Sequence, residues 1–254
     1  MAKKLLIKKE RKTIVDDRLV LLSKFEKHLV DDAKDYSTQY GVIKKDDLKN
    51  DSVKVGKEEF TILNPSFIDN YKQIRRLAQI ITLKDIGAII ANTGINKESI
   101  ILDAGTGSGA LACFLGVIAK KVVSYDIKDE HLAVARQNVN SLKLKNVQIK
   151  KGDIFDSKNV REKNIDVFIL DVTEPWRGIN TADKILKKGG FLVSYSPNIN
   201  QVDLFVKSLS ENFLYEKTVE IIEREWTVKG QVLRPQMKDF GHTAFLSFAR
   251  KITK

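Results

Sequence analysis

The stretch that most limits what this chain can fold into is LDAGTGSGALA, residues 102–112. In this stretch an apolar run is followed by closely spaced glycines, and the glycines are followed by small apolar residues. The turn itself consists of Gly105, Thr106, Gly107, Ser108 and Gly109. Because glycine permits tight backbone turns and the close approach of a ligand, the pattern predicts a buried strand, a ligand-binding turn and the start of a helix.

Strand-like and helix-like segments alternate from about residue 86 onward. The apolar runs are nearly continuous in Val, Ile and Leu, which is typical of strands buried on both faces of a parallel sheet. The expected strands are 99–105, 121–126, 147–155, 166–172, 191–197, 215–228 and 242–250, and the expected helices are 109–119, 131–142, 179–186 and 200–209. The alternation predicts an α/β, Rossmann-like fold with a seven-stranded, mostly parallel sheet, closed by an antiparallel pair at its edge.

The first 70 residues have a different character. Short apolar pieces at 19–22, 53–55 and 60–63 are separated by Asp, Lys, Asn and Gly, which favours short strands and turns. Helical periodicity is found there only around 67–81. We therefore expect a small β-rich N-terminal domain over residues 1–70 and a larger Rossmann-like domain over residues 71–254.

Composition narrows the choice of partners. Lys and Arg number 44 against 33 Asp and Glu, a net charge of +11, which favours a nucleic-acid partner, although genome bias or thermal adaptation gives similar balances. No apolar run approaches the roughly 20 residues that span a membrane. The single cysteine, Cys113, lies in an apolar stretch and reads as a core residue, and the scattered histidines offer no metal-ligand spacing. We expect a cytoplasmic protein without a membrane or metal partner.

Acidic residues at the ends of the first two strands suggest what the turn binds. Asp103 precedes the first glycine, and a carboxylate there suits a sulfonium or ammonium ligand better than a pyrophosphate. Asp126 ends the next strand, where a carboxylate can accept the ribose hydroxyls of a nucleoside. Dinucleotide binding stays open, since counting Ala110 completes G-x-G-x-x-G/A, as does a merely tight turn. Asp126 alone also fits a helix cap.

Two further strand ends carry polar or aromatic residues. After the third strand, Asp153 can accept from an adenine amino group while Ile154 packs on the ring. After the fourth, Asp171 is followed by Pro175 and Trp176, a cluster suited to hold a flipped base by a carboxylate and a stacked ring. The bland alternative is that Asp171 only bounds a strand and that Trp176 belongs to the core.

Several segments together resemble one enzyme family, the tRNA (adenine-N1)-methyltransferases of the bacterial and archaeal TrmI type. The resemblance covers nearly the whole chain after about residue 18, and its C-terminal motifs are far more specific than a glycine-rich turn. The segments are QYGVIKKDDLKN (39–50), RRLAQIITLKDIGAII (75–90), DVTEPW (171–176), GGFLVSYSPNINQV (189–202) and EREWTVKGQVLRPQMKDFGHTAFLSFARK (223–251).

The resemblance implies an S-adenosylmethionine-dependent enzyme, a homotetramer, that methylates adenine-58 in the tRNA T-loop, with adenine-57 also modified by some archaeal members. Asp171 is implied as the catalytic carboxylate, Tyr195 as a neighbour of the target base, and His242 and Thr243 as residues facing the pocket. The implied cofactor residues are Gln79, Gly105, Thr106, Gly107, Ser108, Gly109, Asp126 and Asp153, to which the residue analysis adds Asp103, Ile154 and Asp171.

The chain departs from the family pattern at two places. Thr82 and Leu83 stand where many relatives have Tyr-Pro, and Lys44 or Lys45 replaces a usual His. Two other functions remain open from sequence. One is a protein-isoaspartate or other carboxyl methyltransferase, which shares the glycine-rich turn, and the other is a non-catalytic tRNA-binding partner subunit.

Overall fold

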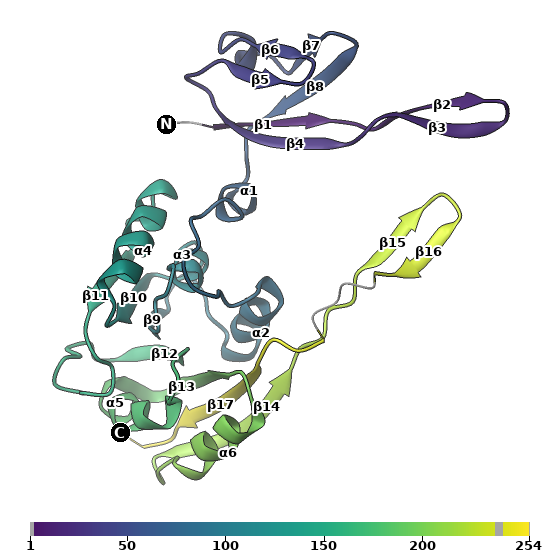
Figure 1. Cartoon of the computed structure of the whole chain (residues 1–254). Coiled ribbons are helices and arrows are strands. Elements are labelled where there is room, and N and C mark those ends of the chain that lie inside the picture. Colours follow the sequence, from purple (N-terminus) through teal and green to yellow (C-terminus); the bar gives the residue numbers. More distant parts are fainter. Residues whose placement is uncertain (1–2, 237–240, 254) are drawn as a thin grey trace. The chain divides into compact units, whose positions relative to one another are not determined.

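The computed structural model describes residues 3–236 and 241–253. The chain divides into two compact units, Met1–Gln73 and Ile74–Lys254 (Figure 1).

The first unit is built on a four-stranded antiparallel sheet in the order β4-β1-β8-β7. Alternate residues of β8 are buried, so one face of this sheet covers a core of Leu6, Val30, Ile43, Leu48 and Phe60. The elements of the unit are β1 (Lys3–Lys8), β2 (Arg11–Val15), β3 (Arg18–Ser23), β4 (Glu26–Asp31), β5 (Tyr36–Thr38), β6 (Gly41–Ile43), η1 (Asp47–Lys49), β7 (Ser52–Val55), β8 (Glu58–Leu63) and α1 (Phe67–Tyr71). The pairs β2–β3 and β5–β6 form separate hairpins.

The second unit contains a seven-stranded sheet in the order β11-β10-β9-β12-β13-β17-β14. Neighbouring strands from β11 to β13 are parallel, whereas β17 is antiparallel to both of its neighbours, β13 and β14. The strands are β9 (Ile100–Ala104), β10 (Lys121–Asp126), β11 (Val147–Lys151), β12 (Ile165–Leu170), β13 (Leu186–Ser196), β14 (Phe213–Glu220) and β17 (Phe245–Lys251). The expected Rossmann-like sheet and its antiparallel edge pair are confirmed.

Helices cover both faces of this sheet. Helices α5 and α6 lie on one face, and α3 and α4 lie on the other (Figure 1). Phe168, Leu170 and Leu192 of the sheet pack against Ile185 of α5 and Phe205 of α6. The helices are α2 (Leu83–Thr93), α3 (Ala110–Leu115), α4 (Asp129–Ser141), η2 (Pro175–Gly178), α5 (Ile179–Ile185) and α6 (Ile199–Lys207). Cys113 is fully buried in α3, and burial raises the pKa of its thiol to about 12, as fits a core residue.

Several expected elements are shorter than the sequence predicts. The strand expected over 215–228 is wrong in its second half, because β14 ends at Glu220 and a separate hairpin follows, β15 (Trp226–Lys229) with β16 (Val232–Pro235). The charged run 223–225 lies between β14 and β15, and Gly230 makes the hairpin turn with φ +58°. The strand expected over 242–250 begins only at Phe245, and that expected over 147–155 ends at Lys151.

The helix expected over 67–81 is also wrong beyond Tyr71. The amides of Leu77 and Ala78 donate to the Ser108 hydroxyl, and the amide of Arg75 donates to the Asn138 side chain. These amides are therefore not available for the i to i−4 hydrogen bonds of a helix. Among helices within the described residues, none has the length and apolar content needed to cross a membrane.

Candidate active site at the carboxyl edge of the sheet

The glycine-rich turn, residues 105–109, joins β9 to α3. Gly105 has φ +96°, and a Cβ there would lie 1.9 Å from the backbone oxygen of Asp171. Gly109 has φ +75°, and its Cβ would lie 2.9 Å from the Cβ of Ala135 in α4. The first glycine lets the turn touch the end of β12, and the second lets it touch α4, so glycine is required at both positions.

Most amides of this turn already donate within the protein. Those of Gly105 and Thr106 donate to the Tyr125 carbonyl, at 2.9 and 3.1 Å. The amide of Gly107 donates to Asp126 Oδ2 at 2.9 Å, and that of Gly109 donates to the Thr106 carbonyl. A pyrophosphate cradle depends on free amides. Because most amides of this turn are already bonded, the turn is poorly suited to bind the pyrophosphate of a dinucleotide.

Three carboxylates converge beside the turn. Asp103 is 1% exposed, and burial together with the charge of Asp126 raises its pKa to about 6, although the Ser124 hydroxyl donates to it at 2.6 Å. The pKa of Asp171 is raised to about 7, first by burial and then by Asp103 and Asp126. Within the described residues, no side-chain cation or donor contacts the Asp171 carboxylate. Such a cluster favours a positively charged ligand, which would relieve the mutual repulsion.

Asp126 is held in place by three hydrogen bonds. Its Oδ1 accepts from the Lys128 amide at 2.9 Å, and its Oδ2 accepts from the Gly107 amide and lies 3.1 Å from His131 Nδ1. The carboxylate thus bridges the glycine-rich turn and the start of α4. An ionised carboxyl has about four lone-pair sites, so it retains acceptor capacity for a ligand hydroxyl.

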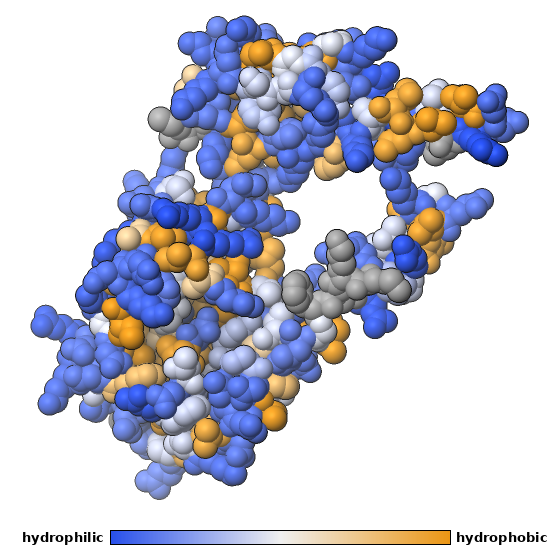
Figure 2. All heavy atoms as spheres, in the orientation of Figure 1, coloured by the Kyte–Doolittle hydropathy of each residue, from blue (hydrophilic) through white to orange (hydrophobic). Residues whose placement is uncertain are grey.

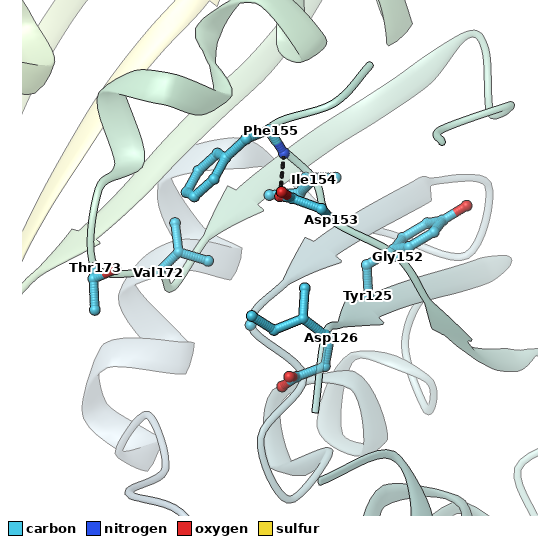
Figure 3. A pocket seen from close by; sticks show the side chains of 10 residues that line it. Tyr125, Asp126, Gly152, Asp153, Ile154, Phe155, Val172 and Thr173 are labelled. Atoms are coloured by element: carbon cyan, nitrogen blue, oxygen red, sulfur yellow. Dashed lines mark hydrogen bonds between the residues drawn. The ribbon is translucent and has the colours of Figure 1, made fainter. Parts of the chain in front are cut away.

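A cavity of about 150 Å³ opens between the ends of β10, β11 and β12 (Figure 3). Phe155 stacks under the Arg177 guanidinium at 4.5 Å, and Ile127 exposes 62% of its surface although it is apolar. Asp153 Oδ1 accepts from the Phe155 amide at 2.9 Å. The lining residues are Gly105, Tyr125, Asp126, Ile127, Gly152, Asp153, Ile154, Phe155, Val172 and Thr173. Apolar walls with carboxylates at the mouth suit a nucleoside base and its ribose.

A second group of polar side chains gathers around Tyr195, near the carboxyl end of β13. Its hydroxyl donates to Asp85 Oδ2 at 3.3 Å, and burial, Asp85 and Asp171 raise its pKa, so it stays a neutral phenol. Thr243 Oγ1 also donates to Asp85 Oδ2, at 2.8 Å. Thr82, at the position of a departure from the family pattern, donates to the same oxygen at 2.9 Å. Tyr195 thus joins this cluster to the surroundings of Asp171.

The remaining predicted site residues lie differently. Gln79 is exposed in a segment without helix or strand. Trp176 is partly buried in η2 and packs against the core. His242 Nδ1 lies 2.6 Å from Glu220 Oε1, and its Nε2 lies 2.8 Å from the Pro197 carbonyl. Both ring nitrogens of His242 are thus engaged within the protein, and none of these predicted residues lines the cavity.

Some residues of the site were not found from sequence. Asn138 binds the backbone of Arg75 and the carbonyl of Ser108, so it fastens segment 75–78 over the glycine-rich turn. Its signal is a polar residue on the buried face of α4, beside Val139. Phe155 could have been found as the apolar neighbour of Ile154. Asp85 lies in segment 75–90, which carries part of the family resemblance, but the sequence assigned it no role because its partners lie up to 158 residues away.

The site fits the cofactor that the sequence implies. Asp103 Oδ1 is buried without a hydrogen-bond partner, an arrangement that is costly unless a ligand supplies a donor or a positive charge. The Gly105 backbone at the cavity wall, a held carboxylate at Asp126 and an apolar cavity after β11 suit a cationic nucleoside.

Comparison with known proteins identifies the family. Residues 72–235 match the family model described as "tRNA methyltransferase complex GCD14 subunit". A tRNA (adenine(57)-N(1)/adenine(58)-N(1))-methyltransferase TrmI from Methanocaldococcus jannaschii is 36% identical over 222 residues, which are 75% of this chain and 78% of the relative. A tRNA (adenine(58)-N(1))-methyltransferase TrmI from Thermus thermophilus is 34% identical over 199 residues, 76% and 78% of the two chains.

Solved structures of methyltransferases share the fold of this chain. The tRNA (m1A58) methyltransferase TrmI from Aquifex aeolicus superimposes with a TM-score of 0.76 at 27% identity, over 99% of this chain and 97% of the other. A SAM-dependent O-methyltransferase from Thermotoga maritima gives a TM-score of 0.81 at 28% identity, over 100% and 94%. Because the family model and relatives above 30% identity span most of the chain, the protein belongs to the tRNA methyltransferase family of the GCD14 subunit.

Proposed function

We propose that this protein uses S-adenosylmethionine to methylate N1 of adenine-58 in the T-loop of tRNA. The relatives from Methanocaldococcus jannaschii and Thermus thermophilus are named for this reaction, the first also for adenine-57. The observation that carries the proposal is the cluster of Asp103, Asp126 and Asp171, which adjoins a mostly apolar cavity of about 150 Å³ through Asp126. Among the described residues, no side-chain cation is bonded to Asp103 or Asp171. A sulfonium nucleoside matches both the charge and the shape of this cleft.

The cofactor end of the site follows from the strand ends. Asp126 would accept the ribose hydroxyls, and Asp153 the adenine amino group, with Ile154 and Phe155 against the ring. The Gly105 backbone, which lines the cavity, would lie against the methionine part near Asp103, and Gln79 would approach it from the exposed segment before α2. When bound, S-adenosylmethionine supplies an electrophilic methyl group. The backbone of the turn residues 105–109 would contribute the shape of the binding surface rather than hydrogen bonds, because most of its amides already donate within the protein.

The substrate end is centred on Asp171. Adenine N1 has an in-plane lone pair, so the protein needs to position it rather than deprotonate it, and positioning can supply about 7–11 kcal/mol of a barrier. An ionised Asp171 that accepts from the N6 amine gains in strength as methylation makes the ring cationic. Tyr195 would contact the everted base, with Thr243 and His242 beside it and Trp176 in the loop after β12.

Exposed apolar side chains support a homotetramer. The hairpin β2–β3 exposes Ile14 at 71% and Leu22 at 55%, and the hairpin β15–β16 exposes Val228 at 75% and Leu233 at 66%. Figure 2 shows apolar residues gathered over both hairpins. Contiguous apolar surface of this kind marks association sites. We place the enzyme in the cytoplasm, where its tRNA substrate is processed.

The test is methyl transfer from labelled S-adenosylmethionine to an unmodified tRNA transcript, followed by mapping of the modified nucleoside. We expect 1-methyladenosine at position 58, and its loss when that adenine is replaced by guanine. Transfer to the carboxyl groups of a peptide, with none to tRNA, would instead support the carboxyl-methyltransferase alternative. Binding of tRNA without binding of S-adenosylmethionine would support the non-catalytic one.

A further inference from the structure

Asp85 is a fully buried carboxylate in the first turn of α2, and it does not line the cavity. Four side chains from three separate segments donate to it. The donors are Lys84 Nζ at 2.7 Å to Oδ1, and Thr243 Oγ1 at 2.8 Å, Thr82 Oγ1 at 2.9 Å and Tyr195 OH at 3.3 Å to Oδ2. Lys84 Nζ also donates to Thr243 Oγ1 at 2.6 Å, so the donors are joined to one another.

Four side-chain donors compensate the buried charge of Asp85. Burying a carboxylate is costly unless cations and donors compensate its charge. Because a hydrophobic residue in its place often gives equal stability, stability alone does not explain a buried carboxylate at this position. Here the carboxylate fixes donors that the fold brings from the start of α2, from β13 and from the segment before β17. One of these donors is Tyr195, and the charge of Asp171 contributes to the raised pKa of its phenol.

The bond to Asp85 sets where the Tyr195 hydroxyl can be. The ring of Tyr195 is partly buried, and its hydroxyl donates to Asp85 and also hydrogen-bonds to Thr243, which itself donates to Asp85. A hydroxyl anchored at its far end limits rotation of the side chain, which matters because small misplacements at a reacting centre are costly in rate. Asp85 is 0% exposed and is not among the residues that line the cavity, so it does not itself meet a ligand there.

We propose that Asp85 is a positioning residue for methyl transfer: it holds the Tyr195 hydroxyl and thereby sets the pose of the ring against the target base. The inference rests on the proposed function, in which Tyr195 contacts the everted adenine. Lys84, Thr82 and Thr243 hold the Asp85 carboxylate in place. Asp85 then acts through Tyr195 and contacts neither the cofactor nor the base.

The test is a double-mutant cycle of Asp85→Asn and Tyr195→Phe, read as kcat and as KM for each substrate on the full-length protein. Each single variant should lower kcat by about tenfold or more while KM for S-adenosylmethionine changes by less than about twofold. If Asp85 acts through the hydroxyl, Asp85→Asn in the Tyr195→Phe background should change kcat by less than about twofold. Falls in kcat that multiply would overturn the proposal, as would full activity of either single variant.

A matched control separates positioning from folding. Asp166 also pairs with a lysine, Lys187, and accepts from a backbone amide, that of Ile100, but lies at the start of β12. Asp166→Asn should therefore lower stability without a coupling to Tyr195→Phe. If Asp85→Asn does not fold, Asp85→Glu replaces it in the cycle, since it keeps the charge beside Lys84 and moves only the acceptor oxygens. Absence of methyl transfer in the wild-type protein would instead remove the proposed function, and this inference with it.

Discussion

The Asp171 carboxylate lies just after β12, where its own burial and the charges of Asp103 and Asp126 disfavour its ionised form. Its pKa is about 7 in the folded protein against an ordinary 3.8. Between about pH 4 and pH 7 the unfolded chain binds fewer protons than the folded one, so stability falls as pH rises through this window. The residue that the chemistry needs therefore weakens the unliganded fold at neutral pH.

We predict that Asp171→Asn stabilises the unliganded protein at pH 8, while methyl transfer is lost. Because solvent partly reaches the side chain, we expect a gain of about 1–2 kcal/mol rather than the full value of the pKa shift. At pH 3 the gain should nearly vanish, since the wild-type carboxyl is then largely protonated in both the folded and the unfolded state. Urea unfolding at the two pH values measures this, and an equal change at both would rule out the raised pKa as the cause.

Gly105 gives a prediction about space. Alanine there would place its Cβ 1.9 Å from the Asp171 backbone oxygen, at φ +96°, so we expect Gly105→Ala to cost about 3 kcal/mol or more and to weaken S-adenosylmethionine binding. Gly189 has a similar φ, +82°, but open space around it, so Gly189→Ala should show the backbone strain alone, about 1 kcal/mol. Equal losses of stability in the two variants would mean that the contact with β12 is unimportant.

The sequence revealed the strand-end residues of the site because parallel strands bring their carboxyl ends to one edge. Asp126 and Asp153 are found there with Gly105, as the alternation of strands and helices predicts. The cluster around Asp85 was out of reach, because it depends on tertiary pairing between α2 and Thr243, 158 residues apart. The full use of both His242 nitrogens was likewise visible only in the fold.

At the scale of elements, His242 ties the end of β13 to the end of β14, just before β17 begins. Glu220 first, and then the Pro197 carbonyl, raise the pKa of its imidazole above 6.5. Because the folded pKa exceeds the unfolded one, the stabilisation is complete below about pH 6.5 and is lost as pH rises through the folded value. Both nitrogens can donate only while the ring is protonated.

We therefore predict that His242→Gln lowers the melting temperature more at pH 6 than at pH 9. Thermal unfolding of the variant and the wild-type protein, compared at the two pH values, measures the effect. Gln keeps one donor and one acceptor but no titratable group. A loss that is the same at both pH values would show that the proton on His242 does not matter to this junction.

The elements that sequence predicted best are those whose pattern is set by burial on both sides. Strands β9, β10 and β12 are continuous apolar runs in the sheet interior, and they lie within a residue or two of their expected bounds. The error over 215–228 arose where the chain leaves the core, since three of the four residues of β15 are exposed and the strand pairs with β16 rather than with the sheet. Periodicity alone does not distinguish a long edge strand from a strand followed by a hairpin.

At the scale of the whole molecule, the two exposed hairpins give a prediction about assembly. Val228→Lys together with Leu233→Lys should lower the mass measured by light scattering from a tetramer to a smaller species, because the charges would be buried in the interface. As a control, Val117→Lys with Leu204→Lys changes two exposed apolar residues of the second unit, one in the turn after α3 and one in α6. A hairpin variant that keeps the mass of the control variant would contradict the proposed role of the hairpin.

The most direct test of the account is single-turnover methyl transfer to an unmodified tRNA transcript by the wild-type protein and by Asp171→Ala, with S-adenosylmethionine affinity measured by calorimetry on both. We expect 1-methyladenosine at position 58 with the wild-type protein. With the variant we expect a rate lower by about 100-fold or more and a cofactor affinity within several-fold of wild type. Equal rates for the two proteins would contradict the assignment of Asp171 as the group that stabilises the methylated base.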